Sequence, residues 1–285
     1  MRPQDVPAAE RLTADAYYEV DASTSSPNLP APAKRSAQRG EAWVARTSHV
    51  LATDPGGCWV AEDDVGLVGL AVSMRRELMW VLGSFAVRPG RQGEGIGRPL
   101  LEAAMTHSRG CLRGMLSASP DPRALRRYAA AGFRLHPQMF LTGAVDRSVL
   151  PVVEKVRDGS AADIELMDSL DRRTRGAAHG PDHELLLATS RLLVSDTGTG
   201  SGYVYSQPGG GPSLLAASNR RTAARLLWAV LADAGPSVTV GHLTGANDWA
   251  VDVGLAARLD LHQSGYLALR GMKPPSPYVH HGVLL

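Results

Sequence analysis

The sequence predicts a mixed α/β (α+β) protein of two tandem domains, residues 1–148 and 149–285. Short apolar runs with the length of strands alternate with amphipathic stretches of helical period along the chain. Within the run 80–105, a glycine-rich loop joins one such strand to a helix. The order of elements in the first half recurs after about residue 150, and 285 residues suit two domains of ordinary size.

The strand–loop–helix run is the most informative part of the sequence. Trp80–Val87 is apolar with little alternation, which indicates a strand covered on both faces. Glycines then stand at 93, 95 and 97, and the apolar residues that follow have the period of an amphipathic helix. Because glycine lacks a Cβ, backbone N–H groups can converge there beside the free donors of the helix start. The run therefore predicts a cradle for an anion such as a phosphate.

The glycine spacing separates this loop from two commoner phosphate-binding motifs. A dinucleotide-binding loop has the pattern Gly-x-Gly-x-x-Gly, but counting from Gly93 its last position is Arg98. A nucleotide triphosphatase loop needs Gly-Lys-Ser/Thr, which the chain lacks. On the glycines alone, a glycine-rich turn without a ligand remains the alternative.

With the preceding strand and the helix, the pattern Gln92-x-x-Gly95-x-Gly97 resembles the acetyl-CoA pyrophosphate loop of the GCN5-related N-acetyltransferase (GNAT) superfamily. Tyr128, one turn before Gly132-Phe133, looks like the family's second signature. The resemblance covers about the first 145 residues. It implies a mixed, mostly antiparallel sheet flanked by helices in each domain.

The elements expected in the first domain follow the family's order. We expect helices at 2–18 and 43–53, strands at 58–62, 67–75, 80–87, 114–119 and 134–145, and a helix at 121–131. The Ser/Pro-rich segment 22–33 predicts a mobile loop. The family places this part of the chain over the acceptor site, although a plain surface loop fits equally well.

The second half repeats this order. We expect strands at 152–157, 191–196, 203–206, 213–217, 237–244 and 262–271, and helices at 164–172, 222–234 and 248–258. At the position of the phosphate loop, however, the chain has only Ser218-Asn-Arg-Arg-Thr222. Without the glycines, phosphate binding by the backbone is doubtful, so this copy is interpreted as degenerate.

The resemblance also implies site residues in the first domain. Those that would bind the cofactor are Phe85, Ala86, Val87, Gln92, Gly93, Glu94, Gly95, Ile96, Gly97, Arg98 and Ser119. The backbone of 85–87 would pair with the pantetheine arm and donate an N–H to the thioester oxygen. Ser119 stands where the family often has an asparagine.

Two catalytic residues are predicted. Tyr128 would protonate or hydrogen-bond the departing sulfur, or else merely pack in the core. Many relatives keep a carboxylate base in the central strand, but here that position holds Val81 or its neighbour Trp80. Glu77 is the substitute that we predict, with Glu41, a water chain or simple solvated charges as alternatives.

Composition excludes several other classes of function. The formal net charge is only +2 and no basic run with interleaved aromatics occurs, so we expect no nucleic-acid partner. Two cysteines form no disulfide framework, and no apolar stretch reaches the roughly 18 residues of a membrane span. Residues of types that bind metals occur at His179, Asp182 and His183 and in the pair His280-His281. No third metal ligand stands at a suitable spacing from them, so we expect solvated loop histidines and no metal. We expect a cytoplasmic protein.

The sequence thus predicts an N-acetyltransferase that transfers an acetyl group from acetyl-CoA to the amine of a small molecule by direct attack on the thioester. A protein or peptide N-acetyltransferase and a non-catalytic acyl-CoA sensor are the alternatives. We expect a monomer, with the second domain acting as an internal stand-in for a dimer partner, or a homodimer.

Overall fold

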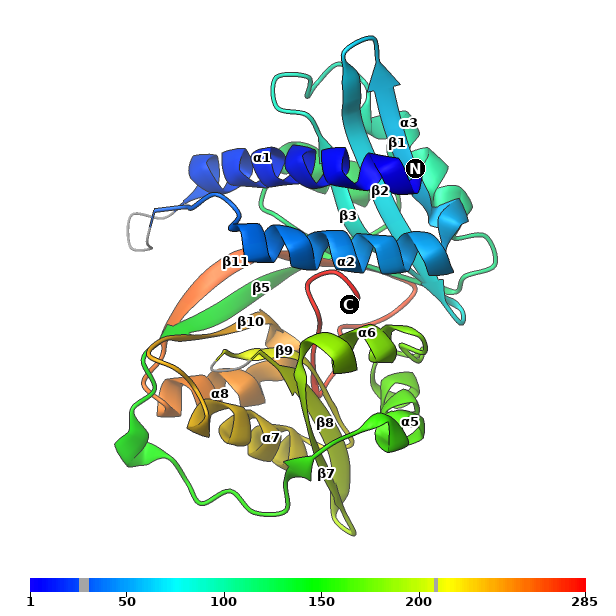
Figure 1. Ribbon diagram of the computed structural model, residues 1–285. Helices are drawn as coiled ribbons and strands as arrows, with labels where there is room; N and C mark the ends of the chain where they lie inside the picture. The colour runs from blue at the N-terminus through cyan, green and yellow to red at the C-terminus, as the bar shows by residue number, and fades with distance from the viewer. Residues whose placement is uncertain (26–30, 208–209) are drawn as a thin grey trace. The chain divides into compact units, whose positions relative to one another are not determined.

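The computed structural model describes residues 1–25, 31–207 and 210–285, which form two compact units, Met1–Phe133 and Arg134–Leu285. Both units are mixed α/β structures with helices packed on sheets, which confirms the predicted fold class (Figure 1). Within each unit, the strand pairs among the described residues are antiparallel except for β3 (Met79–Val87) and β4 (Arg113–Ala118), which are parallel.

The first unit contains four helices and four strands among its described residues. They are α1 (Val6–Thr24), α2 (Ala37–Thr53), β1 (Cys58–Asp63), β2 (Gly66–Arg76), β3 (Met79–Val87), α3 (Gly97–Thr106), β4 (Arg113–Ala118) and α4 (Pro122–Ala130). The strands lie side by side in sequence order. The predicted Ser/Pro-rich loop overlaps α1 at 22–24, and its residues 26–30 lie outside the described residues.

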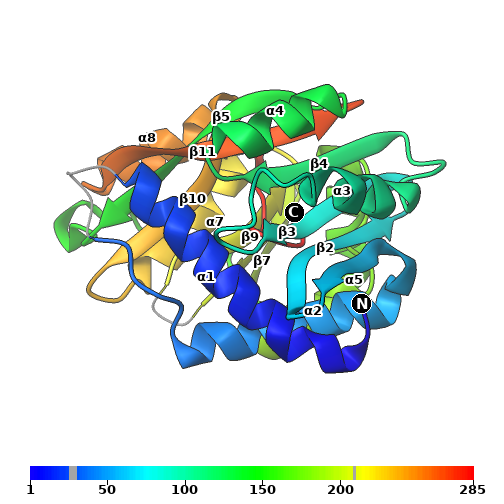
Figure 2. The ribbon, with the colours of Figure 1, turned by 90° about the horizontal axis from the view of Figure 1, so that it is seen from above.

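The strands β2 and β3 are covered on both faces, as their continuous apolar sequences predict. Figures 1 and 2 show α1 and α2 on one face and α3 on the other. Leu70, Met74, Trp80 and Val81 are completely buried between these layers. Each such side chain contributes roughly 1.5–3 kcal/mol to folding.

The second unit begins with β5 (Arg134–Gly143), the strand expected to close the first domain. Its other elements are β6 (Arg157–Asp158), α5 (Ile164–Thr174), α6 (Asp182–Thr189), β7 (Arg191–Thr197), β8 (Gly200–Ser206), β9 (Pro212–Ala217), α7 (Arg220–Ala232), β10 (Val238–Thr244), α8 (Asp248–Ala256), β11 (Asp260–Arg270) and β12 (Tyr278–Val279). One sheet has the order β12-β9-β8-β7-β6, with α5 and α7 packed on β8 and β9.

β5 (Arg134–Gly143) pairs with β10 on one side and β11 on the other, and α8 packs on all three strands. Gly254 of α8 lies so close that a Cβ there would come within 2.7 Å of Leu141. By its contacts this strand therefore belongs to the second unit, although the boundary at 148/149 assigns it to the first domain.

Three features of the second unit differ from the expectations. The strand expected at 152–157 is reduced to β6, and neither α6 nor β12 was expected. Helix α6 lacks a clean amphipathic pattern because the polar residues Asp182 and His183 are buried together with Leu186. The expectation of solvated histidines is wrong for His179 and His183, which are completely buried, and for His280, which is 2% exposed.

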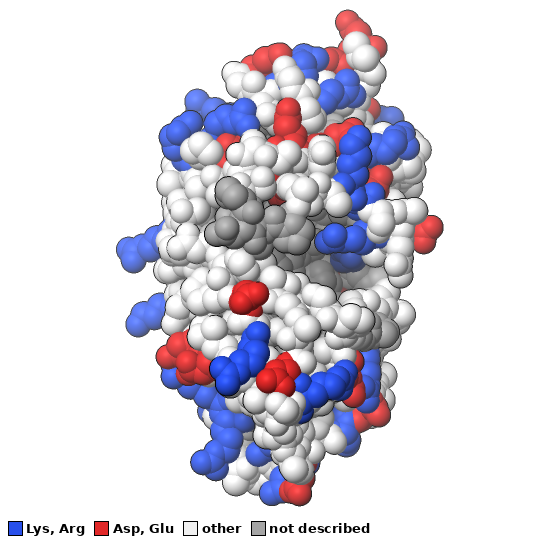
Figure 3. Space-filling view, turned by 90° about the vertical axis from the view of Figure 1, so that its left-hand side faces the viewer, with Lys and Arg blue, Asp and Glu red and all other residues white. Residues whose placement is uncertain are grey.

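The described residues contain no helix that is both long and apolar enough to cross a membrane. On the face drawn in Figure 3, basic and acidic side chains are interspersed and do not gather into a patch of one sign.

Buried histidines make the second unit sensitive to acid. Burial lowers the pKa of His242 to about 4 and that of His280 well below its usual value. In the unfolded chain both titrate near 6.5, so below that pH the unfolded state binds protons that the folded state does not. Stability should be full above pH 6.5 and fall as the pH drops from 6.5 to 4, by on the order of 3 kcal/mol for His242 alone. Urea unfolding at pH 7 and pH 5 measures this, and an unchanged midpoint would contradict it.

Candidate active site

Among the described residues, no strand beyond β2 pairs with the second half of β3, so this half has an open edge. Its parallel pairing with β4 runs from Met79 to Leu82 and ends at Leu116. On the other side of the strand, Ser84 pairs with Val72 but Leu82 with Ser73, so Gly83 is the extra residue of a β-bulge. The pairing with β4 thus ends where the bulge begins.

The hydrogen-bond alternation shows which backbone groups this edge presents. The Arg88 N–H donates to the Val68 oxygen of β2 at 2.8 Å. Alternate residues of an antiparallel strand point to the same side, so the N–H and C=O groups of Phe85 and Val87 point away from β2. An extended ligand could pair with them as an added strand.

The glycine loop follows directly and begins α3. Gly93 and Gly95 have φ of +93° and +88°, where other residues are strained, and a Cβ at either would point into open space. Gln92 Nε2 donates to the Val87 oxygen at 3.3 Å, and Arg91 is held by Asp63 and by Glu94. The N-cap position of α3 is Ile96, whose side chain makes no capping hydrogen bond, so the first N–H groups lack a side-chain acceptor.

A cleft of about 560 Å³ continues from the loop between α3 and α4. Four arginines line it, namely Arg98, Arg123, Arg126 and Arg127. Arg98 pairs with Glu102 at 2.8 Å and Arg123 with Asp121 at 3.1 Å, whereas Arg126 and Arg127 have no ion pair within the described part of the chain. The α4 arginines were not predicted as site residues, although three of them stand within the five residues 123–127.

The strand end, the loop and α4 meet at Gly97. A Cβ built there would lie 3.5 Å from the side chains of Phe85 and Val87 and 3.6 Å from Arg127 Nε. The structure therefore brings the predicted backbone groups, the predicted phosphate cradle and the arginine cleft together in one region of the first unit.

Tyr128 lies at the same place. Its helix α4 begins with Pro122 and is capped by Asp121, which accepts from the Arg123 N–H. The Tyr128 ring packs edge-on against Phe85 at 6.3 Å, and the residue is 5% exposed. Burial, together with the nearby Tyr17, raises the pKa of Tyr128, so the hydroxyl stays protonated. Its hydroxyl has no hydrogen-bond partner among the described residues, which leaves it able to donate to a ligand.

Tyr17 of α1 is a further candidate site residue, which the sequence did not reveal. Its hydroxyl is hydrogen-bonded to the Ser84 side chain and to the backbone of Phe85. Although Tyr17 as a whole is 37% exposed, burial of this hydroxyl raises its pKa. Tyr17 thus touches the backbone group of Phe85 that points to the open edge. Its only sequence signal is an aromatic residue with a polar tip on a helix.

The remaining predicted residues are less central. Ala86 is buried, and Ser119 is exposed directly after β4, whose end points the same way as the end of β3 because the two strands are parallel. Glu77 is exposed in the turn between β2 and β3, at the opposite end of β3 from Phe85 and roughly 25 Å away along the strand. The structure does not bring Glu77 together with the others.

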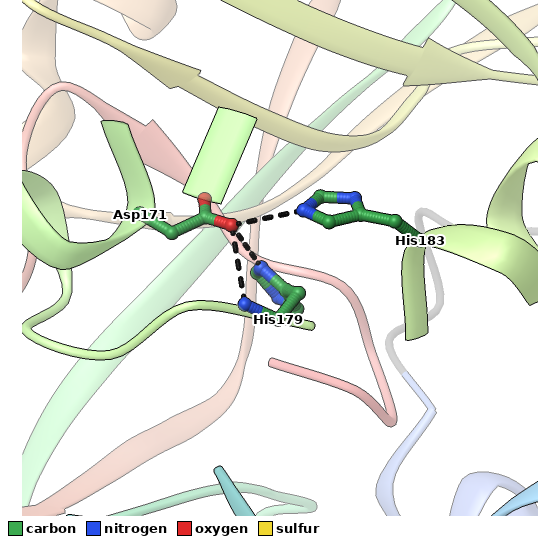
Figure 4. Close-up of side chains that lie close together, drawn as sticks. All are labelled: Asp171, His179 and His183. Atoms are coloured by element: carbon green, nitrogen blue, oxygen red, sulfur yellow. Dashed lines mark hydrogen bonds and ion pairs between the residues drawn. The ribbon is translucent and has the colours of Figure 1, made fainter. Parts of the chain in front are cut away.

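Three side chains of types that can bind a metal ion lie close together in the second unit (Figure 4). Asp171 Oδ2 lies 2.7 Å from His179 Nδ1 and 3.3 Å from His183 Nε2, and all three residues are completely buried. Burial alone would raise the pKa of Asp171, but the neighbouring His179, His183 and Arg175 hold it well below its usual value.

The hydrogen bonds of this cluster do not fit a metal. Arg175 Nη1 lies 2.8 Å from His179 Nε2, and because a guanidinium only donates, Nε2 must be the acceptor. The His179 proton is then on Nδ1 and is donated to Asp171, so Nδ1 has no lone pair for an ion. If Nδ1 bound a metal, Nε2 would carry a proton aimed at Arg175. The Tyr203 hydroxyl also donates to Asp171, at 2.5 Å, which leaves this cluster as a hydrogen-bonded network.

Comparisons with known proteins agree with the first unit's architecture. The family model of the acetyltransferase (GNAT) domain matches residues 54–135, which run from the end of α2 to the start of β5. Comparison with curated protein sequences gave no match.

Solved structures resemble the whole chain. A Pyrococcus horikoshii protein assigned as an acetyltransferase superposes with a TM-score of 0.73 at 17% identity, over 99% of this chain and 90% of that chain. A GCN5-related N-acetyltransferase from Sphaerobacter thermophilus superposes with a TM-score of 0.58 at 15% identity, over 100% of this chain and 96% of that chain. A GCN5-related N-acetyltransferase from Kribbella flavida superposes with a TM-score of 0.54 at 18% identity, over 92% of this chain and 70% of that chain. At these identities the likeness shows a shared fold.

Proposed function

Because residues 54–135 belong to the acetyltransferase (GNAT) family, we propose that this protein is an N-acetyltransferase that acetylates the amine of a small molecule with acetyl-CoA. The observation that carries the proposal is the convergence at Gly97 of an open strand edge, a phosphate cradle and an arginine-lined cleft. Together these match the three parts of coenzyme A, which are an extended amide chain, a pyrophosphate and a phosphorylated nucleoside.

Each part of coenzyme A would have its own partner. The pantetheine arm would pair with the N–H of Val87 and the C=O of Phe85. The pyrophosphate would lie on the loop 92–98 and the uncapped start of α3. Arg126 and Arg127 would face the phosphate on the nucleoside, since planar guanidinium groups bind phosphate oxygens in pairs.

The chemistry then takes place beside Phe85. The amine nitrogen attacks the thioester carbon, a C–N bond forms, and the carbonyl oxygen becomes negative. The Phe85 N–H and the Tyr17 hydroxyl would donate to that oxygen, after the hydroxyl gives up its contact with Phe85. When the C–S bond breaks, Tyr128 would hydrogen-bond the leaving sulfur. Because burial raises its pKa, Tyr128 acts as a donor rather than by losing its proton completely. The proton that the amine loses balances the one that the thiolate finally gains.

One observation favours a second candidate function, a non-catalytic acyl-CoA sensor. The predicted base Glu77 lies at the far end of β3, and among the described residues the polar side chains whose contacts place them at Phe85 are the hydroxyls of Tyr17, Ser84 and Tyr128. A hydroxyl cannot accept a proton from an ammonium group as a carboxylate or imidazole does. Under the sensor reading acetyl-CoA binds but no amine releases its thiol.

Replacing Gly95 with valine should weaken acetyl-CoA binding by at least about tenfold, because a β-branched residue at φ +88° is strained and its Cβ would point into the cradle. The matched control is Gly110→Val. Gly110 also has a positive φ, +82°, and open space around it, but it lies outside the loop. Calorimetry on both folded variants measures the effect. Equal affinities for Gly95→Val and the unchanged protein would exclude the loop as the phosphate site.

A further inference from the structure

The second unit contains a strand edge that corresponds to the proposed cofactor edge of the first. β9 follows two antiparallel strands and leads into α7, as β3 follows β1 and β2 and leads into α3. The Ser218 N–H donates to the Ser201 oxygen of β8 at 2.8 Å, just as the Arg88 N–H donates to β2. By this register Ala217 corresponds to Val87, and Leu215 to Phe85. Their backbone groups therefore point away from β8.

A segment of the chain itself occupies this edge. β12 pairs antiparallel with β9, Tyr278 opposite Ala216 and Val279 opposite Leu215. The Ala217 N–H donates to the Pro277 oxygen at 3.3 Å. The strand edge that pairs with no strand at Phe85 and Val87 in the described part of the first unit is thus paired with β12 at the corresponding residues of the second.

Several further contacts hold this segment in place. Asn247 bridges it at two points, since its Nδ2 donates to the Pro275 oxygen and its Oδ1 accepts from the Tyr278 N–H, both at 3.0 Å. The Ser276 hydroxyl donates to the Ala246 oxygen at 2.8 Å. Arg175 of the buried network donates to the Leu284 oxygen at 3.2 Å. Tyr278 and Val279 are 1% and 0% exposed, so the segment is part of the core.

The helix start that follows β9 also differs from its counterpart. Asn219 caps α7 by accepting from the Thr222 N–H at 2.9 Å, and its amide donates to the Thr199 oxygen at 3.0 Å. At the start of α7 a backbone N–H group is thus hydrogen-bonded to a capping side chain, whereas the start of α3 has no side-chain cap. No loop of glycines separates β9 from α7.

We propose that segment 275–279 is a built-in occupant of the second unit's cofactor edge, so that this unit is closed to acyl-CoA and each chain binds one molecule. The segment lies at the position that corresponds to the pantetheine arm in the first unit. The Asn219 side chain lies at the helix start that corresponds to the pyrophosphate site. This inference rests on the proposed function for what the first unit binds. The second unit is then a folded copy whose ligand site is filled by its own chain.

Calorimetry with acetyl-CoA and hydrogen exchange by mass spectrometry test the inference together. We expect one acetyl-CoA site per chain. Gly95→Val should lower the affinity of this site, and no second acetyl-CoA site should appear in the variant. Peptides spanning 275–279 and Ala217 should be strongly protected, and saturating acetyl-CoA should leave that protection unchanged. A second site, or faster exchange of 275–279 when acetyl-CoA is added, would overturn the proposal.

A variant separates the inference from the proposed function. Asn247→Ala should raise the rate of hydrogen exchange in 275–279 by at least about tenfold, because it removes the hydrogen bonds that Asn247 makes with this segment. The affinity for acetyl-CoA should stay within about twofold, because Asn247 lies in the second unit and the proposed acetyl-CoA site lies in the first. Unchanged exchange in this folded variant would refute the bridge by Asn247. If the intact chain binds no acetyl-CoA at all, the proposed function fails, whereas the protection of 275–279 still decides whether the edge is occupied.

Discussion

Replacing Tyr128 with phenylalanine should lower kcat by about 10²-fold while the Kd of acetyl-CoA changes less than about threefold. The substitution removes one hydroxyl and keeps the ring that packs on Phe85. The sulfur becomes negative only as the C–S bond breaks, so the lost hydrogen bond counts in the transition state and not in cofactor binding. Single-turnover kinetics of thiol release measures the effect on the chemical step.

Tyr266→Phe is the matched control for Tyr128→Phe, because it removes the same atom from β11 of the second unit. Its turnover should equal that of the unchanged protein. If Tyr128→Phe also keeps full turnover while chemistry limits the rate, Tyr128 serves only to pack against Phe85.

Replacing Asp171 with asparagine should destabilise the second unit by about 3–5 kcal/mol. The carboxylate accepts from His179 and Tyr203 and balances the charge of the buried Arg175. The amide that replaces it has one acceptor atom instead of two, and the change removes a buried negative charge that interacts with the Arg175 guanidinium. Urea unfolding followed by a probe in the second unit measures the loss.

The control is Asp158→Asn, which removes a carboxylate paired with Arg191 at 2.8 Å on the surface. Such exposed pairs contribute at most about 1 kcal/mol. If Asp171→Asn costs no more than Asp158→Asn, the network around His179 does not depend on a buried charge.

The parts of the site that were predictable depend on local backbone chemistry. Gly93 and Gly95 adopt a left-handed conformation that favours glycine, and this requirement is visible in the sequence as a spacing. Apart from Ser84, Trp80–Val87 is apolar with little alternation because its strand is covered on both faces. These two features and the Tyr128 signature are each visible as a short local pattern of residues.

The parts that were missed depend on contacts between distant residues. Tyr17 reaches Phe85 across 68 positions of the chain, and nothing in the sequence near either residue marks the contact. The same holds for β5, whose partners β10 and β11 lie about 100 or more residues later, and for β12, which is too short to stand out. The buried histidines were misjudged because polar residues predict exposure unless their partners are known.

The most direct test of the proposed function is a titration with acetyl-CoA followed by thiol release in the presence of a panel of amines, including small molecules and peptides. We predict saturable binding to the first unit and amine-dependent release of free thiol with small molecules. Binding without release for every amine would indicate the sensor, and release with peptides alone would indicate a peptide acetyltransferase. If acetyl-CoA does not bind, the assignment of the edge of β3, the loop 92–98 and the arginine cleft as a cofactor site is wrong.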